Sequence, residues 1–193
     1  LMRKSVLVLF VLLIFLYINA CGYEETVYRK YNFYIHPTSE EIFLKLREAI
    51  QYLNFKIQAP LFNEVLVSSK ANLDINVIKG LESRDGKLGW GELTKSIYIS
   101  TIPNIVLLKA PEKEIYYSGA IDLDYDFCTN TLRASAVDVQ KQFTVLVYHE
   151  LGHVLGLEHE DDEKSIMYPI INSSDKDYDG FFLKIKQILN NDN

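Results

Sequence analysis

The stretch of sequence that decides the interpretation of this chain is residues 149–159, which read His149-Glu150-Leu151-Gly152-His153-Val154-Leu155-Gly156-Leu157-Glu158-His159. An apolar pattern with helical spacing runs from about Ala134 to Leu155, so most of this window is predicted to lie on a helix. On a helix, His149 and His153 are offset by about 40° around the axis and about 6 Å along it. Both imidazoles can therefore reach one metal ion.

Gly156 and His159 extend this pair to three nitrogen ligands. A glycine can adopt the left-handed conformation that ends a helix and reverses the chain, which would bring His159 back towards the metal. Three protein ligands leave one tetrahedral position for water, as in catalytic zinc sites. Glu150 lies about 100° around the helix from His149, so it can face that water as a general base. The window therefore predicts one catalytic Zn²⁺ held by three histidines, with Glu150 as the catalytic residue.

The alternative is a surface helix with unrelated histidines and a chance glycine. Three of the four histidines of the chain lie in this window. A chance match to its five fixed positions in a chain of this length occurs on the order of once in 10⁵. We therefore prefer the metal site.

The window also carries a resemblance to a known family. It is similar to the metzincin zinc signature, and Ser165-Ile166-Met167-Tyr168-Pro169 resembles the methionine turn of the matrixin branch, the matrix-metalloproteinase-like peptidases and their bacterial relatives. This resemblance implies that Met167 forms an apolar floor beneath the metal and is not a ligand. It also implies an α+β, zincin-like fold: a twisted, mostly parallel sheet with an antiparallel edge strand, an active-site helix and a C-terminal helix.

Weaker similarity to the family surrounds the signature, over about residues 30–190. Residues 71–77 resemble its first long parallel strand, residues 119–124 the strand before the active-site helix, and residues 177–182 the start of its C-terminal helix. The chain departs from the family after the third histidine, where Glu160 stands in place of the serine of vertebrate matrixins. Ile170 and Ile171 stand where many matrixins have Pro-x-Tyr. We find no cysteine-switch motif and no second histidine-rich segment, so we expect a single zinc ion.

Other patterns predict the remaining elements. A capping box at Thr38–Glu41 predicts a helix that continues to about Leu53. Strands are expected at 64–67, 71–78, 96–101, 105–109 and 120–127, and a last helix at about 176–189. Glycines at 80, 86, 89 and 91 indicate a loop around Trp90. We expect one α+β domain over residues 21–193, with a short tether at about 21–30 and a substrate-binding edge strand in the region 90–100.

The first twenty residues are predicted to be a signal peptide. Arg3 and Lys4 precede an unbroken apolar run over residues 6–18, which is too short to span a membrane comfortably. The run ends at Ile18-Asn19-Ala20-Cys21-Gly22, which resembles a bacterial lipobox with Cys21 as the lipidated residue. The predicted location is the cell envelope outside the cytoplasm, with a lipid anchor in a bacterial membrane. The alternatives are an uncleaved anchor, or an ordinary signal peptide and a secreted protein.

Composition limits the classes of partner. Hydrophobic residues make up 48% and charged residues 24%, which excludes a disordered chain. Lys plus Arg is 20 and Asp plus Glu is 26, a net charge of −6, so a nucleic-acid partner is not expected. Two cysteines cannot form a disulfide framework, and Cys128 is interpreted as a small buried hydrophobic residue.

Two acidic clusters have simple interpretations. Asp175–Gly180 matches the start of a calcium-binding loop, but Lys186 stands where that loop needs a bidentate acid, so we expect an acidic helix N-terminus. Asp122, Asp124 and Asp126 alternate with apolar residues, which indicates the solvated face of a strand.

These features predict a monomeric zinc endopeptidase that cleaves extended protein or peptide substrates. One alternative is a non-catalytic surface-binding lipoprotein on a metzincin scaffold, although a binding module has no need of the base Glu150. The other is a narrower peptidase that acts on peptide ends or on cell-wall peptides.

Overall fold

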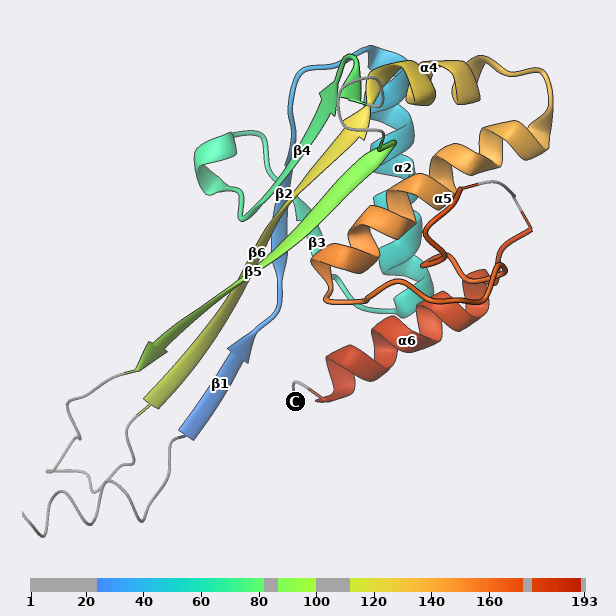
Figure 1. Ribbon diagram of the computed structural model, residues 1–193. Coiled ribbons are helices and arrows are strands. Elements are labelled where there is room, and N and C mark those ends of the chain that lie inside the picture. The colour runs from blue at the N-terminus through green and yellow to red at the C-terminus, as the bar shows by residue number, and fades with distance from the viewer. Residues whose placement is uncertain (1–23, 82–86, 100–111, 172–174, 192–193) are drawn as a thin grey trace, which may run out of the picture. The chain divides into compact units, whose positions relative to one another are not determined.

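The computed structural model describes residues 24–81, 87–99, 112–171 and 175–191 (Figure 1). The chain divides into two compact units, one with Leu1–Tyr28 and Ser96–Tyr116 and the other with Arg29–Lys95 and Tyr117–Asn193. The predicted signal peptide, Cys21 and the strand expected at 105–109 lie outside the described residues. The single domain over residues 21–193 therefore stays a prediction.

The second unit contains a mostly parallel sheet. Its strands β2 (Tyr31–Ile35), β3 (Phe62–Glu64) and β4 (Leu73–Ile78) pair in parallel, and β4 pairs in parallel with the end of β6 (Glu112–Asp124). Strand β5 (Gly89–Ile99) pairs with β6, and Figure 1 shows the two running in opposite directions. The predicted fold class, α+β with an antiparallel edge strand, is confirmed.

The first unit contains β1 (Glu24–Tyr28), which pairs in parallel with the start of β6. The register runs from Glu24 opposite Glu112 to Tyr28 opposite Tyr116. The ring of Tyr98, on β5, meets that of Tyr116 edge to face, with centroids 5.5 Å apart. Strand β1 lies in the segment expected to be a tether, and the sequence analysis did not predict it.

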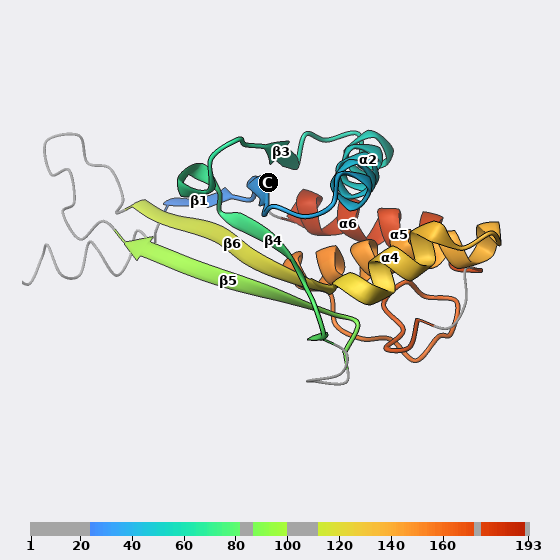
Figure 2. The same cartoon turned by 90° about the horizontal axis from the view of Figure 1, so that it is seen from above.

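Four α-helices occur among the described residues: α2 (Glu40–Ile57), α4 (Tyr125–Arg133), α5 (Val137–Val154) and α6 (Tyr178–Asn191). A short 3₁₀ helix, η1 (Ser68–Lys70), precedes β4. Figure 2 shows the four α-helices grouped together. None of the helices in the described part of the chain is long and apolar enough to cross a membrane.

Helix α5 is the centre of the core. Its residues from Phe143 to Leu151 are buried almost without interruption, and the Tyr148 hydroxyl donates a hydrogen bond of 3.1 Å to the Ala49 carbonyl of α2. The Tyr148 ring stacks on Phe181 of α6 with centroids 5.8 Å apart. Because α2 and α6 both hold it, α5 is a rigid support for the side chains that it carries.

Several predicted boundaries were wrong. Helix α2 is capped by Ser39 rather than Thr38, since the Ser39 hydroxyl accepts from the Ile42 amide at 3.4 Å. The strand expected at 120–127 ends at Asp124, which is 1% exposed and whose carboxylate accepts from the Phe127 amide at 2.8 Å. Asp124 therefore begins α4 and does not belong to a solvated face. Gly89 and Gly91 lie in β5, not in a loop.

Two predictions of a purely structural role were confirmed. Cys128 is free and fully buried in α4, and burial raises the pKa of its thiol to about 12. The Asp177 carboxylate accepts from the Gly180 amide at 2.9 Å, so the acidic segment before α6 begins a helix as expected.

Candidate active site

Three imidazoles converge at the end of α5. The Nε2 atoms of His149, His153 and His159 lie 3.2 Å from one another in each of the three pairs. The first two come from α5, four residues apart. The third returns after Gly156, which has a φ of +88°. The left-handed turn expected at this glycine is present, and it brings His159 back to the helix.

The arrangement of these rings fits a cation. Nδ1 of His149 lies 2.8 Å from the Ile166 carbonyl and Nδ1 of His153 lies 2.9 Å from the Leu157 carbonyl. Since a carbonyl can only accept, both Nδ1 atoms carry the proton and both Nε2 atoms present lone pairs. Lone pairs held 3.2 Å apart repel each other unless a cation lies between them.

The spacing also fits zinc in particular. Tetrahedral zinc with Zn–N bonds of about 2.0–2.1 Å places its nitrogen ligands about 3.3–3.4 Å apart, close to the 3.2 Å found here. Burial lowers the pKa of His149 to about 4 and also lowers that of His153, so both are neutral, as metal ligands must be. The three histidines together form a cluster that could hold a metal ion.

Contacts from Arg29, just before β2, and from Tyr31, its first residue, fix the end of α5. The Arg29 guanidinium donates to the Leu155 carbonyl at 3.0 Å, and the Tyr31 hydroxyl donates to the Val154 carbonyl at 3.0 Å. Both carbonyls are at the negative end of the helix dipole, where a cation is stabilising. These two donors hold the turn that carries His153.

Met167 packs against α5 at Gly152. Its side chain is 1% exposed, and a Cβ added at Gly152 would overlap its sulfur and lie 3.1 Å from its Cε. A side chain at position 152 would force the Met167 side chain to move. The neighbouring Ile166 supplies the carbonyl that orients His149. The turn thus packs against α5 as an apolar support, and its role as the floor of a metal site stays a prediction.

Glu150 points towards the edge strand. It is 4% exposed, and a Cβ added at Gly89 would overlap its carboxylate. Burial raises the pKa of Glu150 to about 8, while a hydrogen bond from the Gly91 amide and the charge of Lys87 act in the opposite direction. The carboxylate therefore lies in a buried position beside β5.

A cavity of about 690 Å³ joins these groups. Its walls are residues 87–91, the α5 residues Leu146, His149, Glu150 and His153, then His159 and residues 169–171. Ile170 and Ile171, which replace the expected family pattern, form part of this wall. Glu150 and all three histidines thus open onto one space large enough for a peptide segment.

Comparison with known families agrees with this geometry. Residues 101–183, somewhat less than half of the chain, match the family model described as Matrixin. The chain is matrixin-like. The matched segment of this matrixin-like chain includes the signature, the Met167 turn and the start of α6, and it supports a zinc metallopeptidase in general terms. No curated protein matches the chain.

Sequence reasoning missed the groups that reach this matrixin-like site from other segments. Among these are Gly89 and Gly91 of β5, the Ile166 and Leu157 carbonyls, and the donor Arg29. The Gly-Trp-Gly run was a usable signal, because glycines in a strand often mark a close approach of backbone. Backbone carbonyls leave no signal in a sequence. The metal and base roles of the histidines and Glu150 stay predictions.

Substitutions at Gly89 and Gly91 of β5 are expected to have different effects, one on activity and the other on stability. The atoms nearest to an added Cβ at Gly89 belong to the Glu150 side chain, which can rotate away, whereas at Gly91 the added Cβ overlaps the Glu150 backbone carbonyl. We expect Gly89→Ala to lower peptide hydrolysis at least tenfold with an almost unchanged melting temperature. We expect Gly91→Ala to lower the melting temperature, by several degrees for a destabilisation of about 1–2 kcal/mol. Calorimetry and a peptide assay on both variants check this, and a fully active Gly89→Ala protein would contradict it.

Proposed function

We propose that the protein is a zinc-dependent endopeptidase. The observation that carries the proposal is the set of three Nε2 atoms 3.2 Å apart, in the same cavity as a buried glutamate. Three imidazoles leave one tetrahedral position open, which is the ligand count of a catalytic and not a structural site. The match to the matrixin model supports the same class of enzyme.

In this proposal His149, His153 and His159 hold the ion and Glu150 moves the proton. A bound zinc ion would acidify a water molecule and polarise the substrate carbonyl. Glu150 accepts the proton of the attacking water. The protonated carboxyl then donates to the leaving amine, so the residue returns to its starting state. The Gly91 amide, bonded to the carboxylate, keeps it aimed into the cavity.

The proposed substrate is an extended peptide beside β5. In the described residues β5 pairs only with β6, so no strand occupies its other edge. Leu88, Gly89, Trp90 and Gly91 line the cavity. An added strand at such an edge is bound by its main chain, which admits many sequences. The cavity wall at Leu146, Ile170 and Ile171 is apolar and suits an apolar substrate side chain.

The proposed location follows from the first twenty-two residues. An apolar run followed by Ile18-Asn19-Ala20-Cys21-Gly22 supports export and a lipid anchor on Cys21. An anchored enzyme of this kind would act on proteins or peptides outside the cytoplasm. We propose that it acts as a monomer.

The proposal is tested by digesting a library of internally diverse peptides with blocked ends. We expect cleavage at internal bonds, loss of all cleavage with a zinc chelator, and recovery when zinc is added back. If the protein cleaves only terminal residues from peptides with unblocked ends, it is an exopeptidase and not an endopeptidase. Zinc binding without any cleavage would contradict catalysis and leave a binding protein.

A further inference from the structure

Glu160, the residue after the third histidine, is the centre of a polar cluster. Its backbone amide donates to the Met167 carbonyl at 3.0 Å, and its carboxylate accepts from the Ser165 hydroxyl at 2.6 Å. The same hydroxyl accepts from the Met167 amide at 3.0 Å. Glu160 therefore ties the segment that carries His159 to the methionine turn at two points.

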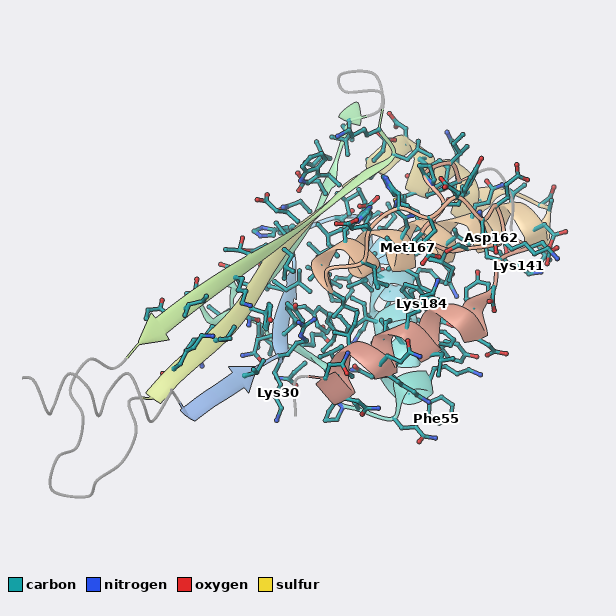
Figure 3. All side chains as sticks on the ribbon, turned by 60° about the horizontal axis from the view of Figure 1, so that its bottom comes forward. Lys30, Phe55, Lys141, Asp162, Met167 and Lys184 are labelled. Atoms are coloured by element: carbon teal, nitrogen blue, oxygen red, sulfur yellow. The ribbon has the colours of Figure 1, made fainter. Side chains whose placement is uncertain are left out.

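Lys184 joins this cluster to the C-terminal helix. Its ammonium lies 2.5 Å from both carboxylate oxygens of Glu160. Figure 3 labels Met167 on the turn and Lys184 on α6, and shows that the two segments are neighbours. The chain separation is 24 residues, so the contact joins parts that only the fold brings together. We call Glu160, Ser165 and Lys184 the α6 clamp.

The α6 clamp reaches two of the three imidazoles. Glu160 is bonded directly to His159 in the chain, and Ser165 precedes Ile166, whose carbonyl lies 2.8 Å from Nδ1 of His149. A shift of the clamp would therefore move one ring through the backbone and tilt the other through its hydrogen bond. Groups that orient metal-binding imidazoles in this way tune metal affinity.

The α6 clamp is expected to contribute little to the free energy of unfolding of the whole protein. The side chains of Lys184 and Glu160 are 40% and 33% exposed, and ion pairs this open to solvent contribute little to folding. Both partners are nevertheless held in one geometry, because the ammonium contacts both carboxylate oxygens and Ser165 fixes one of them. This combination is expected of a positioning device.

We propose that Lys184 is a positioning residue that holds the His149–His159 pair in its metal-binding geometry through Glu160 and Ser165. The inference rests on the metal site of the proposed function and extends it to a residue of α6. It predicts that the C-terminal helix controls metal affinity although it supplies no ligand.

The test measures zinc affinity, and not activity, in purified full-length protein by competition with a chromophoric chelator. We expect Lys184→Met to weaken zinc binding roughly tenfold and to alter the visible spectrum of the Co²⁺-loaded protein. Lys184→Arg, which keeps the charge and two donors, should restore most of the affinity. Lys186→Met is the matched control, since it removes a lysine from the same helix that is not part of the clamp.

The outcomes separate the two proposals. A Lys184→Met protein that binds zinc within twofold of wild type, with an unchanged Co²⁺ spectrum, would overturn the inference. If that variant fails to fold, two other variants must show the same weakening. Ser165→Ala removes the hydroxyl that bonds to Glu160 and to the Met167 amide, and Glu160→Gln removes the charge paired with Lys184. Tight zinc binding by wild type without peptide cleavage would remove the proposed function and leave the clamp intact. Absence of zinc binding by wild type would remove both.

Discussion

Glu150→Ala is expected to bind zinc as tightly as wild type and to hydrolyse peptides about 10²–10⁴-fold more slowly. The reason is that Glu150 opens onto the same cavity as the histidines but lies on a different side of α5. Its removal takes away the proton acceptor and leaves all three Nε2 atoms in place. The measurement is kcat/KM on a cleaved library peptide, together with zinc content by atomic absorption.

Asp138→Ala is the matched control for this variant. Asp138 is an acid on the same helix, and its exposed side chain pairs with Lys141 at 2.9 Å, far along the chain from the histidines. It should keep full activity. A Glu150→Ala protein with wild-type kcat/KM would disprove the assignment of the base, and one that also lost zinc would indicate that Glu150 serves the metal site instead.

His153→Ala is expected to lose both zinc and peptide hydrolysis. Only two imidazoles would remain, and a two-nitrogen site holds zinc far more weakly than a three-nitrogen site. His153 is a better choice than His149 because it is half-buried, whereas His149 is 5% exposed and bonded to the Ile166 carbonyl. Loss of the fold is therefore a smaller concern. Zinc content after dialysis and far-ultraviolet circular dichroism check the two properties separately.

His36→Ala is the control for a general effect of histidine removal. His36 lies outside the cluster, and its Nε2 atom is 3.0 Å from a carboxylate oxygen of Asp74. It should keep one zinc ion per chain and full activity. A zinc content in the His153→Ala protein equal to that of the His36→Ala protein would refute the ligand assignment.

The sequence was informative wherever a local rule governs the outcome. The separation of His149 and His153 follows from the helical repeat, and the reversal at Gly156 follows from the freedom of glycine at positive φ. The buried face of α2 likewise follows from the helical spacing of its apolar residues. These features depend on neighbours within about one or two helical turns.

Local rules failed where neighbours in space override the pattern. Residues 120–127 alternate like a strand, yet the Asp124 amide bonds to the Leu88 carbonyl at 2.8 Å and its side chain starts α4. Tyr31, Phe33 and Ile35 alternate as well, but the strand that they form was not predicted. Its alternation becomes meaningful only when β3 and β4 pair beside it and Tyr31 contacts the end of α5.

By itself the sequence determined the α+β class, the three converging histidines, the turn at Gly156 and the position of the methionine turn. Tertiary structure alone decided which groups orient the site residues. The Ile166 carbonyl orients His149, and the Gly91 amide together with the space left by Gly89 positions Glu150. Lys184 contacts the segment after His159. The physical reason is range. Helical spacing and glycine turns are properties of a few consecutive residues, whereas these partners lie 17 to 61 positions apart and meet only because strands and helices pack.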